Sequence, residues 1–138
     1  MTNQSEIRVL VAEDNFLVSE MITGALEDIG YTVLDKATSG QQAVALTQSL
    51  APDVVLMDIE MPDMDGIEAS RQIARLCPTP VVVLTAYDTP DLVQQATVAG
   101  IGAYLIKPPD KQAMDRAITI AIARFRDLSE LNRLNDLL

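Results

Sequence analysis

The sequence predicts an α/β fold in which helices cover both faces of a parallel sheet. Five short runs rich in valine, isoleucine and leucine alternate with longer segments of helical period, which is the pattern of repeated strand–helix units. The runs are mostly apolar without alternation, as expected for parallel strands that are buried on both faces. A chain of 138 residues, 49% of them hydrophobic, has the size and apolar content of one compact domain.

The first part of the chain gives two strands and two helices in order. Residues 7–12 form the first expected strand. A helix follows, with Gly30 where a left-handed cap would end it. Residues 31–34, the weakest of the five runs, form the second expected strand. Ser39, with Gln42 three residues later, makes a capping-box pattern and predicts a helix over residues 39–49. The first helix is marked by apolar residues on one face: Val18, Ile22, Ala25, Leu26 and Ile29.

The remainder of the chain repeats the pattern. Expected strands cover residues 54–57, 81–84 and 103–106, and a helix over residues 66–76 lies between the first two, ended by Pro78. Thr89 followed by Pro90 predicts a helix over residues 89–99. The last helix is expected to begin near Asp110 and to reach Leu138 without a glycine or proline. It is longer than the usual helix of about 11 to 15 residues.

Composition narrows the classes of function. Ten lysines and arginines against twenty aspartates and glutamates give a net charge of −10, which argues against nucleic-acid and membrane binding by this chain alone. Residues 1–6 are polar and lack the apolar core that a secretion signal needs. Cys77 is the one cysteine in the sequence, which excludes an intramolecular disulfide. These features predict a cytoplasmic protein. Because histidine is absent, any chemistry must be carried by carboxylates.

Acidic residues follow the ends of two strands. Glu13 and Asp14 come after the first strand, and Asp58 comes after the third. The carboxyl ends of parallel strands meet at one edge of a sheet, so these three side chains can converge, and Mg²⁺ would relieve their repulsion. Each acid taken alone is equally well explained as a solvated loop residue.

Two more polar residues follow the fourth and fifth strands. The Thr85 hydroxyl and the Lys107 ammonium could hold phosphoryl oxygens while an aspartate, with Asp58 the central candidate, attacks phosphorus. Lys107-Pro108 alone would indicate only a turn. At the end of a strand, the same dipeptide indicates a peptide bond that is held in one isomer, either trans or cis. That bond directs the lysine side chain inward.

The ordered segments resemble the receiver domain of two-component response regulators, the CheY-like family. They are VLVAEDN at residues 9–15, PDVVLMDIEMPDMDG at residues 52–66, PVVVLTA at residues 80–86 and GIGAYLIKP at residues 100–108. The resemblance implies a doubly wound, flavodoxin-like (βα)5 fold with a parallel five-stranded sheet in the order 2-1-3-4-5. It predicts a receiver domain over residues 1–124 and a helical extension over residues 125–138.

The resemblance also implies a role for each site residue. Asp58 would be the phosphoacceptor, and Mg²⁺ would bind Asp14, Asp58 and the backbone carbonyl of Glu60. Glu13, where an aspartate is commoner in the family, would act through a metal-bound water. Thr85 and Lys107 would bind the phosphoryl group, and Thr85 and Tyr104 would form the switch.

A receiver domain implies a signalling function. It would take a phosphoryl group from a histidine kinase or phosphotransfer protein and control an output domain or partner, catalysing only its own phosphorylation and dephosphorylation. A phosphatase of the haloacid-dehalogenase type is an alternative, but Asp58-Ile-Glu60 lacks that family's second aspartate. A pseudo-receiver that binds partners without phosphorylation is a third interpretation.

The tail gives two further expectations. ARFRDLSELNRL at residues 123–134 resembles the helical linker of regulators that continue into an RNA-binding ANTAR domain. Leu128, Leu131, Asn135 and Leu138 have the 3,4,3 spacing of a coiled-coil seam, which predicts a parallel homodimer through the C-terminal helix. The alternative is a frayed helix end, because two heptads alone are marginal.

Overall fold

The structure, a computed structural model, describes residues 7–86, 94 and 101–137. Its five parallel strands form one sheet in the order β2-β1-β3-β4-β5, which confirms the predicted topology. The strands are β1 (Arg8–Ala12), β2 (Thr32–Ala37), β3 (Val54–Asp58), β4 (Val81–Thr85) and β5 (Ala103–Ile106). The helix predicted over residues 89–99 lies outside the described residues, except for Gln94, which is helical.

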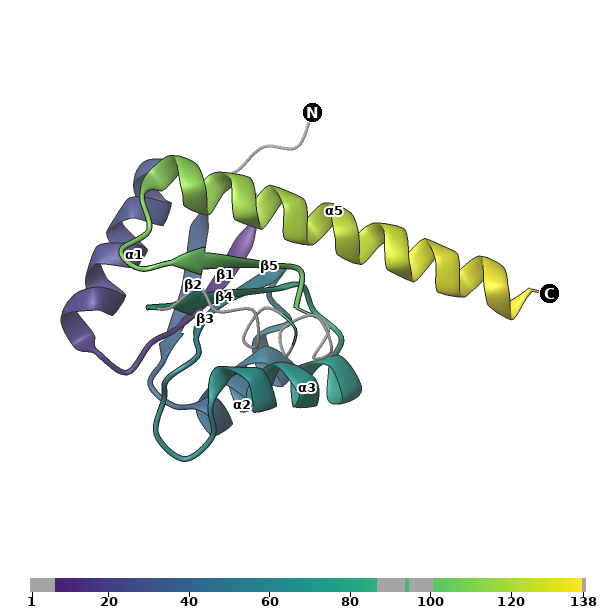
Figure 1. Cartoon of the computed structure of the whole chain (residues 1–138), viewed down its shortest axis with the longest axis horizontal. Helices are drawn as coiled ribbons and strands as arrows, with labels where there is room; N and C mark the ends of the chain where they lie inside the picture. Colours follow the sequence, from purple (N-terminus) through teal and green to yellow (C-terminus); the bar gives the residue numbers. More distant parts are fainter. Residues whose placement is uncertain (1–6, 87–93, 95–100, 138) are drawn as a thin grey trace.

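Helices cover both faces of this sheet, as Figure 1 shows. On one face, α1 (Phe16–Asp28) and α5 (Lys111–Asp136) pack against Val9 and Val11 of the central strand β1. On the other face, α2 (Gly40–Leu50) and α3 (Gly66–Leu76) pack against Leu10 and Ala12. Alternate residues of β1 therefore enter two separate cores, which explains why the run is apolar throughout.

The helix starts follow from short capping side chains. The Ser39 hydroxyl accepts a hydrogen bond from the Gln42 N–H at 3.1 Å, and the Gln42 side chain accepts one from the Thr38 N–H at 2.7 Å. These bonds confirm the predicted capping box, with one difference. The N–H that donates to the Gln42 side chain belongs to Thr38, the residue before the cap, and not to Ser39. The other N-caps are Asn15, Asp65 and Asp110. Gly30 follows α1 with a φ of 104°, a conformation that favours glycine.

The second strand is longer and later than residues 31–34. It runs from Thr32 to Ala37 and includes the exposed Asp35. Because β2 lies at the edge of the sheet, its polar side chains can face solvent while the backbone still pairs with β1. Tyr31 lies before the strand, where it is buried and its hydroxyl donates a hydrogen bond to Asp115 of α5.

Two other strands extend one residue beyond their apolar runs. Asp58 ends β3 and pairs with Leu84, and Thr85 ends β4 and pairs with Ile106. Two of the expected site residues, Asp58 and Thr85, are therefore part of the sheet. Pairing with the neighbouring strands holds the backbone from which their side chains project.

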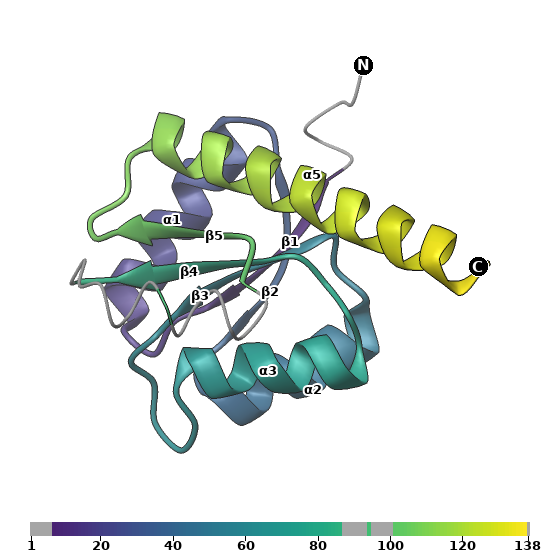
Figure 2. The ribbon, with the colours of Figure 1, turned by 45° about the vertical axis from the view of Figure 1, so that its right-hand side comes forward.

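The last helix extends past the sheet, as both ribbon views show (Figures 1 and 2). It has 26 residues and begins after the N-cap Asp110. Its buried residues all lie between Met114 and Ala121. In the part of the chain that the structure describes, no helix has both the length and the apolar character to cross a membrane.

Candidate functional site

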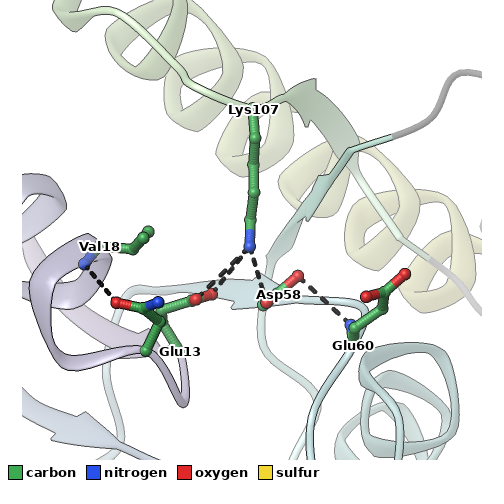
Figure 3. Close-up of polar contacts among 6 residues, drawn as sticks. Glu13, Val18, Asp58, Glu60 and Lys107 are labelled. Atoms are coloured by element: carbon green, nitrogen blue, oxygen red, sulfur yellow. Dashed lines mark hydrogen bonds and ion pairs between the residues drawn. The ribbon is translucent and has the colours of Figure 1, made fainter.

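The central contact of the site is made by Lys107 with two carboxylates. Glu13 follows β1, Asp58 ends β3 and Lys107 follows β5, so their side chains meet at the carboxyl edge of the sheet. Figure 3 shows the lysine reaching down between the two acids. Its Nζ lies 2.8 Å from Asp58 Oδ2 and 3.2 Å from Glu13 Oε2. The convergence expected from the strand ends is therefore present.

Burial makes this contact electrostatically strong. Glu13 and Asp58 are both buried, and Lys107 is partly exposed. Burial raises the pKa of Glu13 to about 7, with further raising by its hydrogen bond to Asp58 and the charge of Asp58, while Lys107 opposes the shift. Burial lowers the pKa of Lys107, but its hydrogen bonds to the two acids and their charges outweigh this and raise the pKa above its usual value.

A third acid gives the site the donor set for a divalent cation. Asp14 is exposed beside the other two, and one carboxylate oxygen from each of Glu13, Asp14 and Asp58 lies within 4.8 Å of the others. Three carboxylates face one ammonium group, so an additional cation would be stabilised. An oxygen-only set with an open side suits Mg²⁺, which keeps several of its waters.

The depression beside these acids is formed largely by the loop between β3 and α3. Ile59, Glu60, Met61, Pro62 and Asp65 line it. The Glu60 N–H donates a hydrogen bond to Asp58 Oδ1 at 3.3 Å (Figure 3). Metal binding by the Glu60 carbonyl stays a prediction.

Gly66 permits the close return of this loop. Its N–H donates to the Ile59 carbonyl at 2.7 Å, and a Cβ at this position would lie 2.3 Å from the Asp58 carbonyl oxygen. Only a residue without a side chain fits there, because the atom that it would meet is backbone.

Sequence reasoning missed two residues that hold the same loop. Asp63 has a φ of 67°, and its Oδ1 accepts hydrogen bonds from the Met64 N–H at 2.6 Å and the Gly40 N–H at 3.2 Å. A Cβ on Gly40 would lie 2.3 Å from the Met64 carbonyl oxygen. The contact joins the start of α2 to the acceptor loop across 23 residues of sequence, and no local pattern reveals it.

The two residues of the expected switch lie on adjacent strands. Thr85 is buried at the end of β4, and its carbonyl accepts a hydrogen bond from the Lys107 N–H at 2.8 Å. Tyr104 lies on β5 and is 41% exposed. The Lys107–Pro108 peptide bond is cis, as the sequence allowed. The switching role of Thr85 and Tyr104 stays a prediction.

Comparisons with known proteins agree on one family. Residues 9–119 match the response regulator receiver domain. The chain is 43% identical over 124 residues to the transcriptional regulatory protein PdtaR of Mycobacterium tuberculosis, a match that covers 90% of this chain and 60% of that protein. It is 38% identical over 125 residues to the response regulator GacA of Pseudomonas viridiflava, covering 89% of this chain and 58% of GacA. The chain thus spans less than two thirds of the length of these relatives.

Solved structures show the same likeness. Chemotaxis protein CheY4 of Vibrio cholerae superposes with a TM-score of 0.76 and 28% identity, covering 82% of this chain and 96% of that chain. A CheX-CheY complex from Borrelia burgdorferi that contains BeF3 and Mg²⁺ matches with a TM-score of 0.77 and 25% identity, covering 81% of this chain and 86% of that chain. Together with the sheet order and the acidic site, these matches show that the chain belongs to the response regulator receiver domain family.

Proposed function

We propose that this receiver domain accepts a phosphoryl group on Asp58 from a histidine kinase or phosphotransfer protein, and that the modified domain controls an output domain or partner. The observation that carries this proposal is the placement of Asp58. Its carboxylate is buried at the sheet edge, 2.8 Å from the Lys107 ammonium and within a cluster of acids that suits Mg²⁺.

The transfer needs one bond to form and one to break. An oxygen of the Asp58 carboxylate attacks the phosphorus of a phosphohistidine, and the bond from phosphorus to the imidazole nitrogen breaks. The electron pair stays on that nitrogen, and the product is an acyl phosphate on Asp58. The ammonium group of Lys107, which bridges Asp58 and Glu13, then lies where it can contact the incoming phosphoryl oxygens.

Mg²⁺ fits the residues that surround Asp58. Asp14 and Asp58 would hold it together with the Glu60 carbonyl, and Glu13 would act through a bound water. The ion would supply positive charge that offsets the carboxylates and the phosphoryl oxygens. The related CheY complex with BeF3 and Mg²⁺ supports this assignment. Thr85 would bind a phosphoryl oxygen together with Lys107.

The phosphodonor would dock on α1. Phe16 and Leu17, the first residues of this helix, are 72% and 77% exposed, and Met21 lies one turn beyond Leu17. They directly follow Asp14 and Asn15, which line the depression at Asp58. An apolar surface at this place suits a donor protein that must bring its phosphohistidine to Asp58.

The test is phosphorylation by a small donor. With acetyl phosphate and Mg²⁺, intact-mass measurement should show one added phosphoryl group on the unsubstituted protein. Asp58→Asn should abolish the addition, because an amide is not a nucleophile for phosphorus. Asp35→Asn, which removes an exposed carboxylate from β2, should leave it unchanged. Undiminished labelling of Asp58→Asn would contradict the assignment of the acceptor.

Assays on the same protein distinguish the receiver function from the phosphatase and pseudo-receiver alternatives. A phosphatase of the haloacid-dehalogenase type would turn over small phosphate esters repeatedly, whereas a receiver domain would lose only its own phosphoryl group. A pseudo-receiver would take up no phosphoryl group. In this chain the exposed Glu60 stands where the haloacid-dehalogenase family has its second aspartate. This difference favours the receiver function.

The C-terminal helix and the comparisons support two further proposals, one on an output domain and one on the limits of the receiver domain. Its resemblance to linkers of ANTAR regulators, together with the match to the transcriptional regulatory protein PdtaR, supports an output domain that follows this helix. Residues 1–124 would form the receiver domain and residues 125–138 the extension. The receiver-domain family and the net charge of −10 favour a cytoplasmic location.

A further inference from the structure

A groove lies at the edge of the sheet where the strands begin, opposite the edge that holds Asp58. Because the five strands are parallel, their first residues meet at this edge and their last residues meet at the acidic site. The last helix runs back over the sheet after β5, so its second half lies over the edge where β4 and β5 begin (Figure 1). We call this depression the amino-edge groove.

Two adjoining hollows make up the amino-edge groove, and they share Ile7, Ile122 and Arg126. The larger has a volume of about 420 Å³ and lies against the segments that lead into β1, β3 and β4. The smaller, of about 280 Å³, reaches Tyr31 and Asp115. None of the described residues that line these hollows also lines the depression at the acidic site. The groove is therefore a separate site, and the larger hollow has the size of a small-molecule pocket.

The larger hollow has rigid, apolar walls. Three prolines line it at positions before the strands, and they are Pro52, Pro78 and Pro80. Proline has a fixed φ, and it has no N–H that would lose a water partner when a ligand covers it. The helix α5 contributes the partly buried side chains of Ile122 and Phe125. The hollow thus offers a preformed apolar surface that includes one aromatic ring.

One charge in the groove is not compensated, and it is positive. Asp53 is held by Arg8, whose backbone nitrogen lies 2.7 Å from Asp53 Oδ2 and whose Nε lies 3.5 Å from it. Asp115 accepts the hydrogen bond from the Tyr31 hydroxyl. Within the described part of the chain, Arg126 has no hydrogen bond or ion pair, and it lines both hollows. An exposed arginine is ordinary by itself, but here it borders an apolar hollow of ligand size.

We propose that the amino-edge groove binds a small amphipathic carboxylate, a molecule with an apolar body and a single negative charge. The apolar body lies against Phe125 and the prolines of the larger hollow. The carboxylate pairs with Arg126, because the planar guanidinium can donate two parallel hydrogen bonds to its two oxygens.

The charges around Arg126 select a ligand with one negative charge. Asp53 lines the larger hollow and Asp115 lines the smaller one, so a second negative charge on the ligand would meet a carboxylate of the protein. The net charge of −10 on the whole chain also disfavours a polyanion. A molecule with one carboxylate and an aromatic or branched body fits the groove best.

The test uses two probes that have the same apolar body. Naphthalene-1-acetate carries one carboxylate, and naphthalene-1-acetamide has a neutral amide in its place. Each is titrated into the full chain while backbone amide shifts are followed by NMR. The acetate should shift the amides of Ile7, Asp53 and Thr79, which line the larger hollow, and the shifts should saturate. It should bind about fivefold more tightly than the acetamide, which corresponds to an exposed ion pair at the upper end of its range.

Variants of α5 identify the two parts of the proposed contact. Arg126→Gln should lower the affinity for the acetate about fivefold and leave that for the acetamide unchanged. Arg116→Gln is the matched control, because it removes an exposed arginine of the same helix that lines neither hollow. Phe125→Ala should weaken both probes alike, by about fivefold, because an aromatic contact is lost. Met21→Ala, which shortens an exposed apolar side chain of α1, should weaken neither.

Several results would overturn the proposal. Equal affinity of the unsubstituted chain for the two probes would show that the groove does not select a negative charge, as expected if it served a protein partner through apolar contacts alone. Equal losses in Arg126→Gln and Arg116→Gln would show that Arg126 is not the partner of the carboxylate. Shifts confined to α1, or shifts that do not saturate, would show that the groove is not the binding site.

This inference is independent of the phosphoacceptor proposal, because the two sites share no described residue. Asp58→Asn should bind the acetate with unchanged affinity, and Arg126→Gln should still be phosphorylated by acetyl phosphate. Loss of acetate binding in Asp58→Asn would contradict a separate site at the amino edge.

Discussion

At the scale of single residues, Lys107 has two electrostatic tasks. It compensates the charge of two buried carboxylates, and it is the group that would contact phosphoryl oxygens after transfer. Its 2.8 Å contact with Asp58 occupies the acceptor in this structure. Phosphorylation would therefore exchange one anionic partner of the lysine for another, and the domain would not have to bury a new unpaired charge.

Removal of this lysine should destabilise the metal-free domain. We expect Lys107→Ala to lower the free energy of unfolding by about 1–3 kcal/mol at neutral pH in chelator, because two buried acids lose their cation. The loss is below that of a fully buried pair because Lys107 is partly exposed and Glu13 can take up a proton.

Urea denaturation measures this loss, and Lys36→Ala is the matched control. Lys36 pairs with Glu20 on the surface, where an ion pair contributes at most about 1 kcal/mol. Equal losses in the two variants would show that Lys107 does not compensate buried charge.

At the scale of elements, the N-terminal ends of α1, α2 and α5 have different structural roles. The start of α1 positions the residues after Asp14 and presents Phe16 and Leu17 to solvent. The start of α2 holds the acceptor loop through Gly40 and Asp63. The start of α5 is tied to the edge of the sheet by Asp115, which accepts a hydrogen bond from Tyr31.

The exposed start of α1 should matter for a protein donor and not for a small one. With a phosphorylated histidine phosphotransfer protein that labels the unsubstituted chain, changing Phe16 and Leu17 to serine should slow transfer about tenfold, because apolar interface contacts carry much of the binding energy. Labelling by acetyl phosphate should not change.

The control for this variant is Leu76→Ser, which alters an exposed leucine at the end of α3. It should transfer at the normal rate. If the α1 variant and this control slow transfer alike, the donor does not dock on α1.

The Tyr31–Asp115 contact predicts how stability depends on pH. Burial, and then the hydrogen bond to Asp115 and its charge, raise the pKa of Tyr31 above its usual value of about 10. The unfolded chain loses this proton near pH 10 while the folded chain keeps it, so the contribution is complete below pH 10 and is lost as the pH rises further.

Urea unfolding at several pH values, from about 8 to about 11, checks this sign. Tyr31→Phe should be about 1–2 kcal/mol less stable at the lower end because a hydrogen bond to a charged group is lost. The gap between the two proteins should narrow as the pH rises. A constant gap would show that the phenol titrates alike in the folded and unfolded chains.

At the scale of the whole molecule, the sheet carries both the acidic site and the two residues of the expected switch. Thr85 ends β4, Lys107 directly follows the adjacent strand β5, and Tyr104 lies on β5. A movement of Thr85 toward a phosphoryl group would change the space beside β5, so Tyr104, which is 41% exposed, could move inward.

This switch predicts spectral changes far from the acids. On adding beryllofluoride and Mg²⁺, backbone amide shifts should change at Tyr104 as well as at Asp58, because the two states differ in more than the site. Asp58→Asn, treated in the same way, should show no such changes at β5. Changes confined to the residues around Glu13, Asp58 and Lys107 would contradict the switch.

The sequence by itself determined the fold class, the alternation of strands and helices and the N-cap at Ser39, because these depend on local periodicity and short side-chain hydrogen bonds. It also indicated that Glu13, Asp58 and Lys107 would converge, because parallel strands end at one edge. The apolar pattern predicted a second strand that is shorter than β2. An edge strand tolerates polar residues such as Asp35, which interrupt an apolar run.

Only the tertiary structure decided how these parts contact one another. The packing of Gly40 against Met64 and the hydrogen bond from Gly40 to Asp63 join segments that have no common pattern in the sequence. The raised pKa of Glu13 depends on burial by the whole sheet edge. The length of the last helix follows from the sequence, but the place where its burial stops, after Ala121, was decided by where the sheet ends beneath α5, because burial needs a neighbour.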